Sequence, residues 1–127
     1  LLIKFGQSGT TKEKKNLLNL SKIPIQRPQR GQRRKRDKEG FYIKYKDCIC
    51  AFDIEATNDM ELIQAYMYIW QFAIKTDEGI SVVYGRTWNE FREFIHNTLL
   101  SNLEEHERII IFVHNLSYEF QYLKSVL

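Results

Sequence analysis

The chain has 127 residues, of which 43% are hydrophobic, and a formal net charge of +3. This length supports one modest domain with its own core, and no apolar run is long enough to span a bilayer. No signal-peptide pattern opens the chain, so we expect a cytoplasmic protein with no membrane partner. Because it starts at Leu1 rather than Met and ends at Leu127 inside a predicted helix, we expect a fragment of a longer protein.

The charge is unevenly distributed. Residues 1–46 carry fourteen Lys or Arg against three acidic residues, whereas residues 47–127 carry five against thirteen. Residues 1–40 are predicted to be a basic, largely extended and mostly unpacked arm or linker, with only a short helix over 11–20. The folded part is predicted to comprise residues 41–127.

The most basic run of this arm covers residues 27–36. Clustered cations of this kind are typical of segments that contact a phosphate backbone, although a solvated linker is an equally open interpretation. The candidate DNA-contacting residues in this run are Arg33, Arg34, Lys35 and Arg36.

Three strands are predicted next. The alternating stretch 41–46 leads into an apolar strand over 48–55, and a loop over 56–59 follows. An aromatic and β-branched strand over 65–75, a turn over 76–79 and a strand over 80–84 then complete an antiparallel meander. Cys48 and Cys50 share one face of the first strand and are expected to be buried free thiols.

A helix is predicted to begin at Thr87, because Thr87 and Glu90 match a capping box. Its apolar stripe comprises Trp88, Phe91, Ile95, Leu99 and Leu103. The continuous apolar run 108–113 predicts a central strand buried on both faces, and a second helix starts near Tyr118. The order β-β-β-α-β-α predicts an α/β fold with a mixed sheet, in the ribonuclease H-like arrangement and truncated at the C-terminus.

The first predicted strand ends in two carboxylates on one face, Asp53 and Glu55. Neighbouring carboxylates repel each other unless a positive charge lies between them, and a hard cation such as Mg²⁺ is the natural partner. The alternative is that Asp-x-Glu is only the solvated start of a loop. If the strand over 108–113 lies parallel to this strand, its polar end at His114 and Asn115 meets the same place.

The stretch 112–120 adds a third acidic residue, Glu119, in the first turn of a predicted helix. Alone, Glu119 is an ordinary first-turn residue; beside Asp53 and Glu55 it becomes a third carboxylate at one site. Asn115 and Tyr118 add a polar group and an aromatic face, which suit the end of a single-stranded nucleic acid.

Phe52-Asp53-Ile54-Glu55 and His114-Asn115-Leu116-Ser117-Tyr118-Glu119 resemble the first two exonuclease motifs of family B DNA polymerases, and most closely those of the protein-primed, phage-type members. Glu119 stands where that family usually has Asp. The third motif, Tyr-x-x-x-Asp, is not found before the chain stops. The resemblance covers residues 48–127.

The resemblance implies a DNA-directed DNA polymerase whose exonuclease part carries out 3′→5′ proofreading hydrolysis of single-stranded DNA ends during replication, with two Mg²⁺ or Mn²⁺ ions. The metal ligands and catalytic residues it implies are Asp53, Glu55 and Glu119. Asn115 and Tyr118 would bind the frayed 3′ end. His114 is a candidate phosphate or primer contact, and the alternative is that it only caps the loop at the end of the strand. Ala56 stands where related phage enzymes have a strand-holding Thr, so Thr57 is the candidate for that role.

The resemblance also implies primer-template DNA and a terminal protein primer as partners, in the bacterial host cytoplasm if the protein is phage-encoded. Because a motif is missing, we expect the chain alone to be at best feebly active. Two alternatives remain: a standalone DEDD-type exonuclease, and a non-catalytic nucleic-acid-binding module. His96 and His106 have no predicted partner.

Overall fold

The computed structural model describes residues 2–6, 10–27, 35–59 and 64–113. Its strands are β1 (Leu2–Lys4), β2 (Lys44–Tyr45), β3 (Ile49–Asp59), β4 (Gln64–Thr76), β5 (Gly79–Gly85), β6 (Glu107–Arg108) and β7 (Ile111–Val113). Its N-terminal helical elements are α1 (Thr11–Lys15) and the 3-10 turn η1 (Leu20–Lys22). The long helix begins with α2 (Trp88–Glu93) and continues as the π-helical η2 (Phe94–Leu99) and the 3-10 turn η3 (Leu100–Asn102). No helix in these ranges is long and apolar enough to cross a bilayer.

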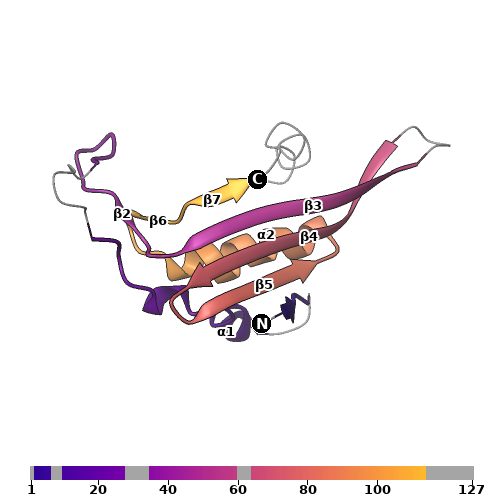
Figure 1. The fold of residues 1–127 in the computed structure, drawn as a ribbon, viewed down its shortest axis with the longest axis horizontal. Coiled ribbons are helices and arrows are strands. Elements are labelled where there is room, and N and C mark those ends of the chain that lie inside the picture. The colour runs from indigo at the N-terminus through magenta and orange to yellow at the C-terminus, as the bar shows by residue number, and fades with distance from the viewer. Residues whose placement is uncertain (1, 7–9, 28–34, 60–63, 114–127) are drawn as a thin grey trace.

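Five strands form one mixed sheet in the order β1-β5-β4-β3-β7 (Figure 1). β3, β4 and β5 are an antiparallel meander, as the sequence predicts, and Gly79 at φ 125° makes the turn between the last two. β1 pairs in parallel with β5, and β7 pairs in parallel with β3. The predicted α/β class and the parallel pairing of the post-helical strand with the first strand of the meander are therefore confirmed.

Trp70 of β4 lies at the centre of the core, fully buried between the sheet and α2. Its indole N–H donates a hydrogen bond to the Thr87 carbonyl at 3.0 Å. Gly85 is opposite Trp70 on β5, and a Cβ there would lie 2.5 Å from the indole carbons, so only glycine leaves room for the ring. The aromatic rings that surround Trp70 are those of Phe5, Phe91 and Phe94.

α2 begins where the sequence predicts. The Thr87 hydroxyl accepts a hydrogen bond from the Glu90 amide at 3.1 Å and donates one to the Glu90 carboxylate at 3.1 Å. The predicted stripe omits Phe94, which is completely buried. Phe94 and Thr98 follow the buried Phe91 at three and seven residues, so they lie on the same inward face of the helix, which is wider than the predicted stripe.

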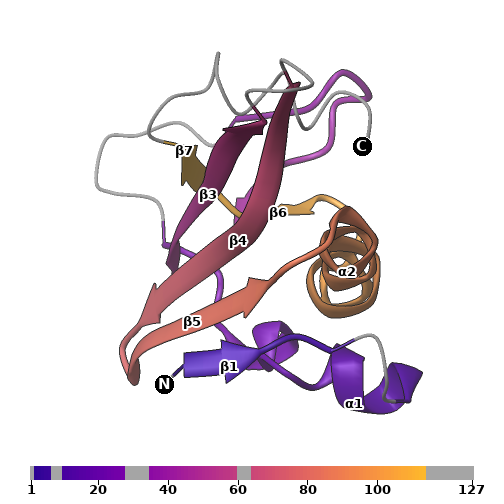
Figure 2. The same ribbon diagram turned by 90° about the vertical axis from the view of Figure 1, so that its right-hand side faces the viewer.

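α1 and α2 lie on the same side of the sheet (Figure 2). The prediction that the strand over 108–113 is central and buried on both faces is wrong for the described residues. β7 covers only Ile111–Val113 and lies at the edge of the sheet, with Phe112 61% exposed. Phe112 is paired with Ala51 and shares its face, which no described helix covers. The apolar run over 108–113 is therefore compatible with an edge strand that has one exposed face.

Part of the expectation that residues 1–40 are unpacked is also wrong. β1 extends the sheet, and Phe5 and Leu20 are buried in the core. α1 starts with a capping box between Thr10 and Glu13, but it ends at Lys15 instead of continuing to residue 20.

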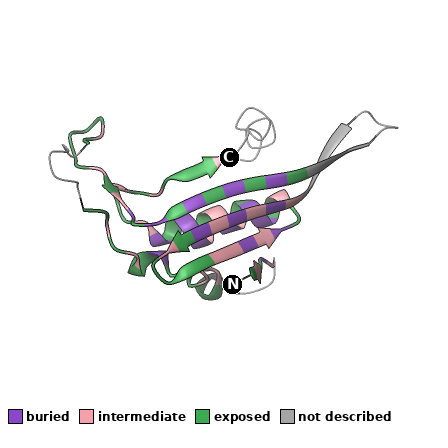
Figure 3. Cartoon of the chain, in the orientation of Figure 1, coloured by how far each residue is buried: buried purple, intermediate pink, exposed green. Residues whose placement is uncertain are grey.

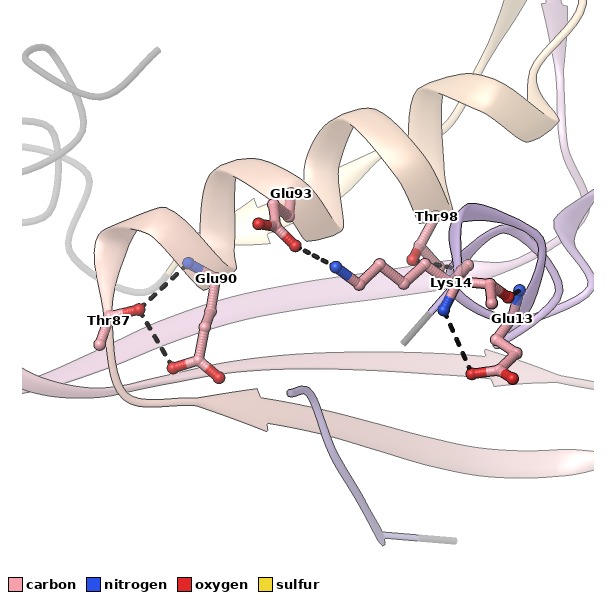
Figure 4. Close-up of polar contacts among 7 residues, drawn as sticks. Glu13, Lys14, Thr87, Glu90, Glu93 and Thr98 are labelled. Atoms are coloured by element: carbon pink, nitrogen blue, oxygen red, sulfur yellow. Dashed lines mark hydrogen bonds and ion pairs between the residues drawn. The ribbon is translucent and has the colours of Figure 1, made fainter. Parts of the chain in front are cut away.

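α1 is held against the long helix by polar contacts (Figure 4). Lys14 forms an ion pair with Glu93, and its carbonyl accepts a hydrogen bond from the Thr98 hydroxyl at 2.6 Å. Asn102 donates a hydrogen bond to the Lys15 carbonyl. These contacts satisfy carbonyl groups near the C-terminal end of α1, which the short helix cannot pair internally.

The stretch 41–46 does not run straight into the first strand. β2 pairs instead with β6 in a separate two-stranded sheet. Lys46, only 5% exposed, forms an ion pair with Glu107 (3.5 Å) and donates a hydrogen bond to the Ile23 carbonyl (3.1 Å). This buried cation therefore joins three segments that are far apart in the sequence.

The packed N-terminal segment leads to a stability prediction. Phe5→Ala should lower the free energy of unfolding by about 3 kcal/mol, because it leaves a cavity beside Trp70. Leu2→Ala is the matched control in the same segment; its side chain is 70% exposed, so the loss should stay below about 0.5 kcal/mol. Urea unfolding of the 127-residue chain measures both, and equal small losses would mean that the segment is unpacked.

Candidate active site

β3 presents two chemically different faces. Cys50, Phe52 and Ile54 are buried, whereas Ala51, Asp53 and Glu55 are exposed, and this alternation is visible along the strand in Figure 3. The face distribution predicted from the period of two is confirmed. Burial of the apolar residues against α2 therefore turns Asp53 and Glu55 to the side of the sheet that no described helix covers.

The two carboxylates lie two residues apart on one strand, which separates their Cα atoms by about 7 Å. Asp53 accepts a hydrogen bond from the Ile54 amide at 2.9 Å. Across the sheet, Asp53 is paired with Gln71 and Glu55 with Ile69. Among the described residues, no Lys, Arg or His forms an ion pair with either carboxylate, so their mutual repulsion is not offset by a described cation.

The register with β4 shifts directly after this pair: Glu55 pairs with Ile69 and Ala56 with Met67, which leaves Tyr68 of β4 as an extra, unpaired residue, as in a β-bulge. Bulges re-aim side chains and are over-represented next to active sites. The predicted loop over 56–59 is wrong, because the backbone of these residues continues β3 and pairs with β4. Thr57 is thus on the strand; its side chain lies outside the described part of the chain.

The end of β7 lies beside the carboxylates. Ile111, Phe112 and Val113 pair in parallel with Cys50, Ala51 and Phe52, so the last described residue is level with the residue before Asp53. The chain that follows contains the remaining predicted site residues, and all of them lie outside the described residues: His114, Asn115, Tyr118 and Glu119.

The donor set suits a hard cation. Carboxylate oxygens are the ligands that Mg²⁺ prefers, and one or two carboxylates plus substrate phosphates are its usual protein environment. Asp53 and Glu55 provide such donors on an exposed face. Within residues 2–6, 10–27, 35–59 and 64–113, no cluster of three or more His, Cys, Asp or Glu side chains forms a metal site.

Of the predicted basic contacts, Arg33 and Arg34 fall outside the described ranges, whereas Lys35 and Arg36 are exposed. Arg36 is part of a small hairpin, in which its backbone bridges to Tyr42 and its guanidinium donates to the Tyr42 hydroxyl at 2.7 Å. Sequence reasoning did not find this aromatic partner.

His106 also has partners that the sequence does not indicate. Its Nδ1 lies 3.0 Å from the Asp37 carboxylate, and its ring is stacked on Phe41 with centroids 4.4 Å apart. Burial raises the pKa of Asp37, but hydrogen bonds from the Phe41 and Glu39 amides and from His106 outweigh this and lower it below the usual aspartate value. The carboxylate is therefore ionised at neutral pH. His106 is 69 residues from Asp37, so no local pattern could reveal the pair.

Cys48 and Cys50 are free and buried, as expected, and their sulfur atoms lie 3.9 Å apart. The hydrogen bond between them, with burial, raises the pKa of Cys50. The same hydrogen bond lowers the pKa of Cys48. These thiols face the core, on the opposite side of β3 from Asp53, and so take no part in the carboxylate site.

No protein-family model matches the chain, and no curated protein or solved structure matches it either.

Burial of the thiols predicts their reactivity. In the native chain, neither Cys48 nor Cys50 should react with Ellman's reagent on the time scale of mixing, because both sulfurs are enclosed in the core. After unfolding in guanidinium chloride, both should react. Rapid reaction of either thiol in the folded chain would contradict the observed packing.

Proposed function

We propose that the chain is the N-terminal part of a 3′→5′ exonuclease domain, of the type found in protein-primed, phage-type family B DNA polymerases, with a ribonuclease H-like fold. The observation that carries this proposal is the parallel pairing of β7 with β3. It brings the strand that precedes His114 alongside the strand that contains Asp53 and Glu55. In an open sheet, the carboxyl ends of neighbouring parallel strands are where binding sites form.

The proposed substrate is a single-stranded 3′ end of DNA, from which a nucleotide is removed by hydrolysis of the terminal phosphodiester. Asp53 and Glu55 would hold Mg²⁺ or Mn²⁺, with Glu119 as a further ligand. When bound, the ions would help to activate the attacking water and to stabilise the leaving oxygen. The exposure of both carboxylates leaves them accessible to a phosphate from solvent.

The other motif residues would position the substrate. Asn115 and His114 would bind the frayed end through hydrogen bonds, and Tyr118 would pack against a base or sugar. Thr57, directly after the bulge, would contact the same strand. The four cations Arg33, Arg34, Lys35 and Arg36 would contact the nucleic acid at a distance from the chemistry.

In such a polymerase, the partners would include primer-template DNA and a terminal protein primer. Its place of action would be the cytoplasm of a bacterial host if the protein is phage-encoded. Proofreading requires the strand end to leave the duplex before hydrolysis. Asp53 and Glu55 lie in the middle of β3 and are exposed on the open face of the sheet, which is accessible to such a frayed end.

Substitution of the paired carboxylates tests the proposal. In the full-length protein, Asp53→Asn and Glu55→Gln should each reduce 3′→5′ degradation of a 5′-labelled single-stranded oligonucleotide by about 100-fold or more, because ion-dependent stabilisation of the transition state is worth several kcal/mol. Rates are measured in Mg²⁺ and in Mn²⁺.

Asp77→Asn is the matched control, since Asp77 is an exposed acid in the turn between β4 and β5. It should leave the rate unchanged, and all three variants should keep the urea midpoint of the unaltered protein. Full activity in Asp53→Asn and Glu55→Gln would reject the exonuclease and favour a non-catalytic binding module.

A further inference from the structure

Residues 35–43, which we name the basic hairpin, fold back on themselves before β2 and project away from the five-stranded sheet (Figure 1). The backbones of Arg36 and Tyr42 form an antiparallel bridge, and the Asp37 amide donates to the Phe41 carbonyl at 2.9 Å. Gly40, at φ 91°, makes the reversal possible. An isolated two-stranded hairpin is marginally stable in water, so its order depends on contacts with the rest of the protein.

His106 provides that contact. One carboxylate oxygen of Asp37 accepts hydrogen bonds from the Glu39 and Phe41 amides, and the other lies 3.0 Å from His106 Nδ1. The Phe41 ring is stacked on the imidazole at an interplanar angle of 21°. The His106 carbonyl also accepts a hydrogen bond from the Lys44 amide at 2.9 Å. The basic hairpin is thus fastened to the loop before β6.

The other side of the basic hairpin carries a stacked cation. The Arg36 guanidinium lies 4.4 Å from the centroid of the Tyr42 ring and donates to its hydroxyl. Stacking on an aromatic ring holds the planar guanidinium in one orientation while its outer face stays open. Tyr42 is 44% exposed, so the stacked pair lies at the protein surface.

Exposed cations outnumber exposed acids on the basic hairpin itself, and Glu105 is an exposed acid beside it, 3.7 Å from His106 Nε2. Lys35, Lys38 and Lys44 are exposed alongside Arg36. Of the two acidic residues in the basic hairpin, Asp37 is already occupied by His106, which leaves Glu39 as its exposed acid. A partner that fits must be a polyanion that also has flat rings to stack.

We propose that the basic hairpin is a binding site for single-stranded nucleic acid, in which a base stacks on the Arg36–Tyr42 pair and neighbouring phosphates contact Lys35 and Lys38. Aromatic and guanidinium stacking beside a cationic surface is the general chemistry of single-strand binding. His106 is a positioning residue, because it holds the hairpin without contacting the ligand. The inference goes beyond the proposed exonuclease: it assigns a site distinct from Asp53 and Glu55 that needs no metal ion.

Fluorescence anisotropy in EDTA, with a short fluorescein-labelled oligothymidylate, separates this site from the exonuclease. Arg36→Ala and Tyr42→Ala should each raise the Kd by about fivefold or more, the lower end of the effect of losing one stacked base. Arg92→Ala removes the same charge from an exposed position on α2 and should change the Kd by less than about twofold. No wild-type binding, or equal losses for Arg36→Ala and Arg92→Ala, would overturn the inference.

An abasic oligomer of the same length tests the stacking. The wild-type chain should bind it more weakly than oligothymidylate, and Tyr42→Ala should not weaken that residual binding further. His106→Ala should raise the Kd for oligothymidylate while leaving the abasic Kd unchanged. Equal wild-type affinity for the two oligomers would overturn the stacking role. Arg36 is exposed, so Arg36→Ala keeps the test valid even if a Tyr42 or His106 variant is poorly folded.

Discussion

The orientation of β3 depends on the packing of aromatic residues between the sheet and α2. Phe52 packs on Phe91 with ring centroids 4.8 Å apart, and Trp70 contacts Phe91 and Phe94. Because successive side chains of a strand point to opposite faces, this packing fixes Asp53 on the outer face. A slip of one residue would turn both paired carboxylates into the core, at a cost of several kcal/mol for each unpaired buried charge. The packing that stabilises the core therefore also fixes the face on which the two carboxylates lie.

A second set of contacts joins the basic N-terminal segment, residues 1–46, to the acidic remainder. Lys46 and Glu107 form a buried ion pair, Asp37 and His106 pair near the surface, and Lys14 pairs with Glu93 on the long helix. Each pair joins segments about sixty or more residues apart in the sequence. In two of these pairs, a lysine of the basic segment binds a glutamate of the acidic remainder, so part of the charge asymmetry stabilises the fold. The cations that remain exposed, among them Lys35 and Arg36, are the ones available to a polyanion.

The sequence predicted the features that depend on strand alternation, on helix capping and on the order of the elements. The period of two placed Asp53 and Glu55 on the outer face of β3, and the Thr87–Glu90 capping box located the start of α2. The parallel pairing of β7 with β3 followed from the order of the elements. These features depend on residues close in sequence, or on a topology with few alternatives.

What the sequence did not predict depends on distant partners. Phe5 and Leu20 belong to short apolar stretches of an otherwise polar and basic segment, and only the finished sheet and helix give them a core to enter. Phe94 lies three residues after Phe91, so helical spacing allows it on the inward face, but the sequence does not show that this face is wide enough to bury it. The contact between His106 and the basic hairpin joins two polar segments that are far apart in the sequence. Neither segment has a pattern that indicates the other, so only the structure shows the contact.

The proposed exonuclease requires that Asp53 and Glu55 bind divalent cations. The most direct test is an NMR titration of the ¹⁵N-labelled chain with Mn²⁺, in which paramagnetic broadening reports the position of the ion. We expect the amides of residues 53–55 to broaden first, before those of the exposed acidic pair Asp77 and Glu78, and we expect Asp53→Asn to abolish this preference. Broadening that is equal at the two places, or that is unaffected by Asp53→Asn, would contradict the proposed exonuclease.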